Sequence, residues 1–242
     1  MSEVSSVSDV LRLRRHHPTR LEGFFDAAFA FAVTVVVISI GHVPHNVPEM
    51  LQAMRGVPAF ALCYMLLIRI WRSHRDWSRR YDLEDETSIR LSMILLFLVL
   101  VYAYPLRLLF ASAVASLSGG WMVDEPVEFH SYDELRIAFV VFGLGHAAIW
   151  LVFALLYRHA LRSAGKIGLD AAEHVATRYL AALSLGFTAI GLASASLATF
   201  MPFATQPWTI WATGLIYSVS GFVAAFLSKH YRRQIIALPA AT

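Results

Sequence analysis

The stretch of sequence that decides the fold is residues 179–228, which reads YLAALSLGFTAIGLASASLATFMPFATQPWTIWATGLIYSVSGFVAAFLS and contains no Asp, Glu, Lys or Arg. A membrane-spanning helix needs about 20 mostly apolar residues, so this stretch is too long for one span and suits two. Pro202 and Pro207 lie in its middle, where proline ends one helix and begins the next. The stretch therefore predicts two membrane helices joined by a turn at residues 201–207.

The composition of the whole chain agrees with a membrane protein. Of the 242 residues, 57% are hydrophobic and 15% are charged, whereas soluble domains are about half apolar and about a quarter charged. This composition excludes a disordered chain, and the single cysteine, Cys63, excludes a disulfide framework within the chain. We therefore predict an all-α, polytopic membrane protein with six transmembrane helices. Its first four apolar spans cover residues 24–40, about 50–71, 91 to about 114, and 137–157.

Basic residues are concentrated in alternate connections, which predicts the orientation of the chain. Arginine and lysine are frequent in residues 12–20, 69–90, 158–178 and 229–233, whereas the connection near residues 124–134 is acidic. Both termini are therefore expected in the cytoplasm, with the chain crossing the cell (inner or plasma) membrane several times. The basic loops would face anionic lipid headgroups, which explains the pI of about 9.2 without nucleic-acid binding.

The charge and hydropathy patterns divide the chain into three parts. Residues 1–19 form a mobile cytoplasmic N-terminal tail, residues 20–233 the six-helix transmembrane domain, and residues 234–242 a C-terminal tail. No cleavable signal peptide is expected, because the first apolar stretch is longer than a typical signal-peptide core and no A-x-A-like site follows it.

Ionisable residues at membrane depth are costly and are functional candidates by default. Asp26 is expected either near the cytoplasmic interface, paired with a nearby arginine, or in a proton-coupling, gating or packing role. His146 lies among small residues, where a hydrogen bond across helices and a proton relay both remain open. Arg69 and Arg107 are expected to extend towards opposite interfaces.

Sequence motifs for metal binding and catalysis are missing. The chain has no H-E-x-x-H, C-x-x-C, G-x-S-x-G or Walker A pattern. We therefore predict no metal, no cofactor and no enzymatic activity.

The first apolar helix carries a stripe of bulky residues. At 3.6 residues per turn, Phe24, Phe31, Val35 and Ile38 fall close to one line, with Thr34 beside it. Such a stripe is consistent with ordinary core packing. On a helix that borders a symmetry axis, it would instead make apolar rings that dehydrate or block an ion path.

Two short segments resemble a known family. The run from Arg20 to Asp26, RLEGFFD, resembles the R-x-x-x-F-S-D signature of the transmembrane protein 175 potassium-channel family, and residues 70–74, IWRSH, resemble its F-W-x-x-H segment. Residues 91–97 followed by Pro105 are also similar to the third helix of the family. These matches cover roughly residues 20–110.

The resemblance implies a homotetramer of six-helix subunits whose first helices line a central pore. It implies apolar rings at Phe31, the narrowest, and at Val35 and Ile38, with Thr34 favouring potassium. It also implies a structural motif cluster at the cytoplasmic end, made of Arg20, Phe24, Phe25, Asp26, Trp71 and His74. Two positions depart from the family pattern: Phe25 replaces the motif serine, and Phe31 replaces a branched aliphatic residue.

These observations together predict a homotetrameric, potassium-leaning cation channel in the lipid bilayer. Monovalent cations, with K+ foremost, would pass without coupling to an energy source. The alternative is a proton-coupled secondary transporter that uses Asp26 or His146.

Overall fold

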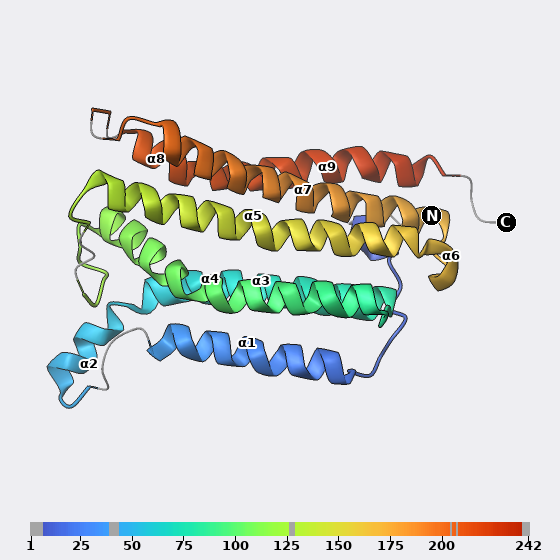
Figure 1. Ribbon diagram of the computed structural model, residues 1–242, viewed down its shortest axis with the longest axis horizontal. Coiled ribbons are helices and arrows are strands. Elements are labelled where there is room, and N and C mark those ends of the chain that lie inside the picture. The colour runs from blue at the N-terminus through green and yellow to red at the C-terminus, as the bar shows by residue number, and fades with distance from the viewer. Residues whose placement is uncertain (1–6, 39–43, 126–128, 204, 207, 239–242) are drawn as a thin grey trace.

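The protein is all-helical over the residues that the computed structural model describes, which are 7–38, 44–125, 129–203, 205–206 and 208–238. The long helices run side by side along one direction (Figure 1). The elements are η1 (Val7–Val10), α1 (Arg20–Ile38), α2 (Val47–Met54), α3 (Val57–Tyr81), α4 (Glu86–Ser118), α5 (Tyr132–Arg162), α6 (Ala164–Ile167), α7 (Ala171–Phe200), α8 (Trp208–Leu215), η2 (Ile216–Ser218) and α9 (Val219–Ile236).

Five helical units within the described residues are long and apolar enough to cross a membrane. They are α1, residues 86–103 of α4, α5, α7, and the unit formed by α8, η2 and α9. The expected turn after α7 is present at its described positions, while residues 204 and 207 lie outside the described residues, as do residues 39 and 40 at the end of the first predicted span. The predicted all-α architecture, with several apolar helices long enough to span a membrane, is thereby confirmed.

The second predicted span, at about 50–71, is not one straight helix. Helices α2 and α3 meet at an angle of 47° around Gly56, and the six-span count holds only when this bent pair is taken as one span. Pro58 lies in the first turn of α3. Backbone N–H groups in the first turn of a helix have no partner within the helix, so proline, which lacks this group, fits there. Proline cannot continue the preceding helix.

Helix α4 is longer than the predicted span and contains Pro105. The ribbon of α4 bends in its second half (Figure 1), as expected where proline removes a backbone hydrogen bond. Beyond the bend, Arg107 forms an ion pair with Asp124, and the Gln52 side chain donates to the Asp124 carbonyl at 3.0 Å. Arg107 is therefore held by a carboxylate of the following loop, which ties α2, α4 and that loop together.

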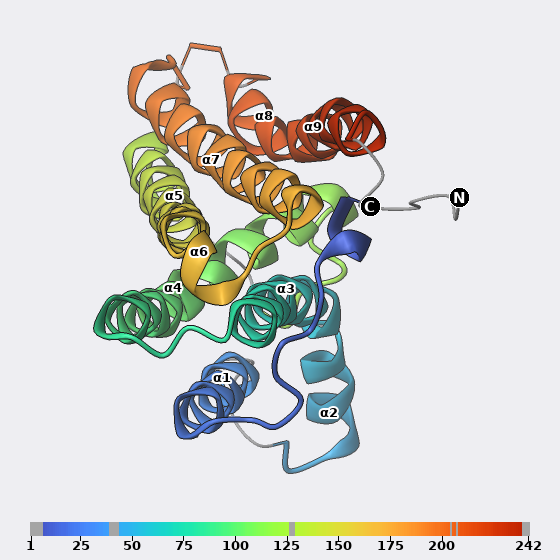
Figure 2. The same cartoon turned by 90° about the vertical axis from the view of Figure 1, so that its right-hand side faces the viewer.

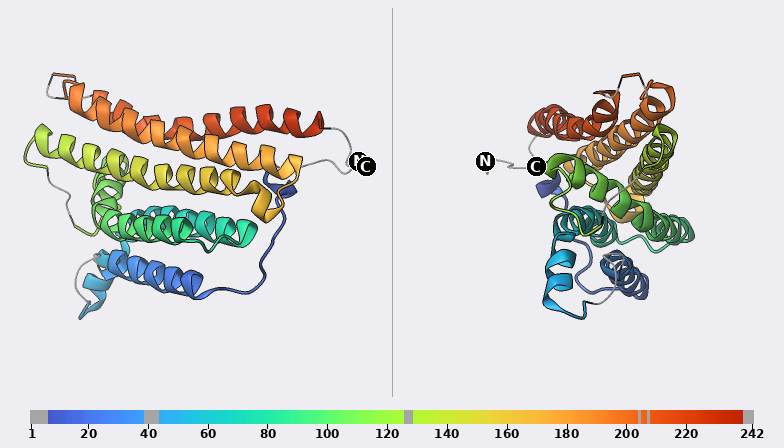
Figure 3. Two further views of the ribbon diagram at one scale, coloured as in Figure 1. Left: turned by 45° about the vertical axis from the view of Figure 1, so that its right-hand side comes forward. Right: turned by 90° about the vertical axis from the view of Figure 1, so that its left-hand side faces the viewer.

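Helices α5 and α7 pack closely against each other. A Cβ added at Gly143 would lie 2.7 Å from the Gly191 carbonyl oxygen, and one added at Gly191 would lie 2.7 Å from that of Gly143. Glycine at both positions lets the two backbones touch, as small residues do between membrane helices. Seen end-on, α5 and α7 lie together on one side of the bundle and α1 lies at the opposite edge (Figures 2 and 3).

The connection between α3 and α4 is held to the end of α5. Asp85 caps α4 by accepting from the Ser88 backbone N–H, and its carboxylate lies 2.7 Å from Nε2 of His159. Burial alone would raise the pKa of Asp85, but the Ser88 and His159 hydrogen bonds outweigh it and hold this pKa below its usual value.

The described part of the N-terminal tail, residues 7–19, packs against the bundle and does not extend freely from it. Val7 and Leu11 are buried against Ala176 and Ile235. Further along, the backbone N–H groups of Arg14 and Arg15 both donate to the Arg79 carbonyl. The segment runs from α9 past α3 to the start of α1 (Figure 2). The expectation of a mobile tail is therefore wrong for these residues.

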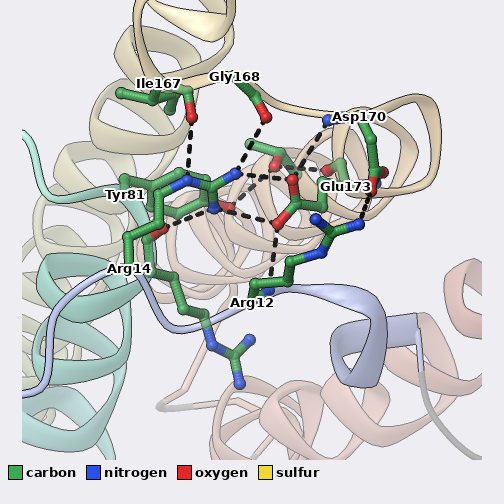
Figure 4. Close-up of polar contacts among 9 residues, drawn as sticks. Arg12, Arg14, Tyr81, Ile167, Gly168, Asp170 and Glu173 are labelled. Atoms are coloured by element: carbon green, nitrogen blue, oxygen red, sulfur yellow. Dashed lines mark hydrogen bonds and ion pairs between the residues drawn. The ribbon is translucent and has the colours of Figure 1, made fainter.

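Glu173 is the centre of this contact (Figure 4). It is fully buried, and its carboxylate accepts from the Arg14 guanidinium at 2.7 and 3.0 Å and from the Arg12 backbone N–H at 3.1 Å. The Arg14 head also donates to the carbonyls of Ile167 and Gly168. Because the N–H groups of the Arg14 guanidinium donate to several acceptors, this ion pair can be buried.

Candidate functional site

Helix α1 has one face packed inside the chain and one face that the chain leaves open. It packs against α3 and α4. The packed face carries Phe25, Phe29, Ala32 and Val36. The open face carries Phe24, Phe31, Thr34 and Ile38, with Val35 half-buried between the two faces. Phe31 is 62% exposed and Ile38 is 69% exposed, so the bulky stripe is not part of this chain's own core.

Asp26 lies on the exposed side of α1, where its carboxylate accepts a hydrogen bond of 2.7 Å from the Trp71 indole of α3. The expected partner was a nearby arginine. Arg20 is exposed, and among the described residues it forms no ion pair with Asp26. The structure thus brings Asp26 and Trp71 together and leaves Arg20 apart.

We predict that the Asp26–Trp71 hydrogen bond stabilises the packing of α1 against α3. A double-mutant cycle of Asp26→Ala and Trp71→Phe should give a coupling energy of about 1–2 kcal/mol, the usual range for a hydrogen bond to a charged group. Thermal unfolding of the purified protein measures it. Asp26→Asn is the matched control, because an amide oxygen can still accept from the indole, and it should cost less than Asp26→Ala. Additive effects of the two substitutions would contradict the coupling.

Phe25 occupies the motif position of serine and contacts His74 through its ring. The two rings stack with centroids 3.6 Å apart and planes 8° apart. His74 is buried, and its Nε2 lies 3.0 Å from the Ser92 hydroxyl of α4. Phe25 therefore supplies a stacking contact in place of a hydrogen bond, and the polar partner of His74 comes from another helix.

Glu22 is a member of this region that the sequence reading missed. Its side chain is 1% exposed and pairs with Arg79 of α3 at 2.8 Å. The signal was present in the sequence, because an acidic residue inside the RLEGFFD run needs a basic partner when it is buried. The partner could not be chosen among the many arginines of residues 69–90.

Thr34 projects from the open face of α1. Its hydroxyl donates to the Ala30 carbonyl of the preceding turn at 2.9 Å. Because that bond uses the hydrogen, the hydroxyl oxygen keeps its lone pairs as an acceptor. An acceptor oxygen is therefore available on the face that carries Phe31 and Ile38.

His146 is buried in an aromatic cluster. Its ring lies 5.0 Å from the Tyr217 ring and within 6.4 Å of the rings of Phe142 and Trp150. Among the residues that the structure describes, it has no hydrogen-bonding partner, and no group of three potential metal ligands occurs there. In the described part of the chain, neither a relay carboxylate nor the expected hydrogen bond across helices accompanies His146.

Comparison with known proteins gives three agreeing results. The family model described as "Endosomal/lysosomal potassium channel TMEM175" matches residues 20–102. A protein of Marivirga tractuosa described as a potassium channel is 34% identical over 208 residues, which cover 84% of this chain and 83% of that protein.

The solved structures include a crystal structure of the potassium channel MtTMEM175, a threonine-to-alanine variant in complex with a nanobody–MBP fusion protein. It matches with a TM-score of 0.79 and 28% identity, over 93% of this chain and 97% of that chain. These relatives are described as channels and not as enzymes, which agrees with the expectation of no enzymatic activity and no cofactor. Their description as potassium channels agrees with K+ as the permeant ion. They do not favour the transporter alternative. The chain belongs to the TMEM175 family of potassium channels.

Proposed function

We propose that four copies of this chain form a potassium-leaning cation channel in the cell membrane, with the first helix of each copy lining the pore. Residues 20–233 would be the channel domain, and both termini would lie in the cytoplasm, as the basic connections indicate. Conduction would be passive.

The open face of α1 carries this proposal. In the single chain, Phe31 and Ile38 are mostly exposed, whereas Phe25 and Phe29 on the opposite face are buried. Figures 1 and 2 place α1 at an edge of the bundle, remote from α7 and α9. In a bilayer such an apolar face meets either lipid or another helix. Membership of a potassium-channel family supports the second case, with copies of α1 arranged around a shared axis.

In this arrangement the apolar side chains would form successive rings. Phe31 would make the narrowest ring, with Val35 about 6 Å and Ile38 about 10 Å further along the axis, from a rise of 1.5 Å per residue. Hydrophobic constrictions control conduction through wetting, because ions must shed part of their hydration to pass.

Flux through liposomes tests the proposal directly. Purified protein in vesicles should carry K+ faster than Na+, with currents that reverse at the Nernst potential and do not depend on a pH gradient. Native mass spectrometry should show four chains per particle. Flux that requires a pH gradient would contradict passive conduction and support the proton-coupled alternative.

Thr34→Val should lower the preference for K+ over Na+, because valine has the shape of threonine but no acceptor oxygen. A contribution of about 1 kcal/mol from that oxygen would make the permeability ratio fall roughly fivefold. Thr34→Ser keeps the hydroxyl and is the matched control, with a ratio close to wild type. Reversal potentials in mixed K+ and Na+ solutions measure the ratio. Equal ratios for the serine and valine variants would remove Thr34 from selectivity.

A further inference from the structure

Arg69 occupies a site that the proposed pore does not use. It is the first basic residue of α3, at the boundary between an apolar half and a half rich in arginine. Its guanidinium carbon lies 4.7 Å from the centre of the Trp150 ring of α5 and 4.5 Å from that of the Phe187 ring of α7. Helices α5 and α7 therefore fix the position of a charge that α3 supplies.

The two rings form a rigid corner for this charge. Trp150 and Phe187 are each 5% exposed, and their centroids are 4.8 Å apart in an edge-on arrangement. Each ring face attracts a cation, and Arg stacks well on such faces because its head is planar and weakly hydrated. The guanidinium is thereby oriented before any ligand arrives.

Arg69 is exposed in the single chain, so a ligand can reach it. Among the described residues, no acceptor takes a hydrogen bond from its N–H donors. The acidic residue on the same face of α3 is Asp76, seven residues on and about 10 Å along the helix. From α5, His146 lies one turn before Trp150, and an imidazole supplies no negative charge there. An unpaired arginine in a membrane-spanning helix is costly unless an anion reaches it.

The surroundings of Arg69 select the kind of anion. Met65, one turn earlier on the same face, is 58% exposed and offers an apolar surface. The turns of α3 that follow Arg69 are rich in arginine and are suited to the depth of the lipid headgroups. A ligand that is anionic at one end and apolar at the other matches both neighbours, and the arginine fork fits two phosphate oxygens.

We propose that Arg69 binds the phosphate of an anionic phospholipid whose acyl chains lie along α3 beside Met65. This site is separate from the open face of α1, and it stands independently of the channel function proposed above.

Lipid titration followed by native mass spectrometry tests the site. The full chain and its Arg69→Gln variant would be titrated with phosphatidylglycerol and, separately, with phosphatidylcholine. Arg69→Gln should weaken phosphatidylglycerol binding about tenfold and leave phosphatidylcholine binding unchanged, as expected for the loss of a charged hydrogen bond. Arg69→Lys, which keeps the charge without the planar fork, should give an intermediate loss. Arg90→Gln is the matched control, because Arg90 is an exposed arginine in an i,i+4 pair with Glu86, and it should bind like wild type.

Three results would overturn the proposal. Arg69→Gln and Arg69→Lys could both bind phosphatidylglycerol as tightly as wild type. Inorganic phosphate alone could raise the unfolding temperature of the wild type but not of Arg69→Gln, which would assign the site to a free anion. Arg69→Gln could dissociate the oligomer in phosphatidylcholine without changing lipid affinity, which would assign Arg69 to a contact between copies. None of these readouts depends on ion conduction, so failure here leaves the channel proposal untouched.

Discussion

Phe31→Ala is expected to raise single-channel conductance about tenfold and to loosen the preference for K+ over Na+. The phenyl ring is 62% exposed on the open face of α1, and four copies around an axis would narrow and dehydrate the ion path. A tenfold rise corresponds to a barrier lower by about 1.4 kcal/mol. Planar-bilayer recordings of the purified protein measure both effects.

Phe25→Ala provides the contrast within the same helix. This ring is 1% exposed and stacks on His74 and Phe29, so its removal should lower the free energy of unfolding by about 3 kcal/mol without raising conductance. Unchanged currents from a well-assembled Phe31→Ala channel would place the constriction elsewhere. A similar rise in both variants would show that loosened packing, and not the width of a ring, controls the flux.

The helical spans could be predicted from the sequence because charge marks their ends. Residues 179–228 contain no charged side chain, and the structure forms α7 and the α8–η2–α9 unit there. The break between α2 and α3 was harder to foresee. Residues 50–71 are apolar on average on both sides of Gly56, so their mean hydropathy does not show a break. Only Pro58 indicated that a new helix begins.

The contacts of the first helix were predictable only in part. The family resemblance of the RLEGFFD and IWRSH runs implied that residues of α1 and α3 share one cluster. The structure joins Asp26 to Trp71 and Phe25 to His74. Which side chains pair with each other depends on how the helices pack in three dimensions. The spacing of residues along the sequence does not reveal that packing. Ser92 lies on a different helix from His74, and its role could not be distinguished from that of the other serines in the chain.

The basic run of residues 12–15 was misread for a related reason. Charged residues near a terminus usually favour a solvated tail, and the acidic partner, Glu173, lies about 160 residues further along the chain. A pair so distant in sequence leaves no local pattern. Its burial depends on how α3, α7 and α9 come together, which composition and periodicity do not determine.

Glu173→Gln is expected to lower the free energy of unfolding by about 3 kcal/mol, because it removes one partner of a buried ion pair. The carboxylate is 1% exposed and holds the Arg14 head at 2.7 Å. It also accepts from the Asp170 backbone N–H in the capping box that begins α7. Glutamine can supply only one acceptor oxygen, and its amide nitrogen would face N–H groups that are themselves donors. Chemical unfolding in mild detergent measures the loss.

The same substitution should free residues 7–19 from the bundle while α7 remains folded. Trypsin should then cleave after Arg14 in Glu173→Gln much faster than in the wild type, where the Arg14 head is held by Glu173, Arg80, Ile167 and Gly168. Glu86→Gln is the matched control, since Glu86 and its partner Arg90 are both largely exposed and such pairs contribute less than about 1 kcal/mol. Equal cleavage rates in wild type and Glu173→Gln would mean that the apolar contacts of Val7 and Leu11, and not the buried charge pair, keep this segment in place.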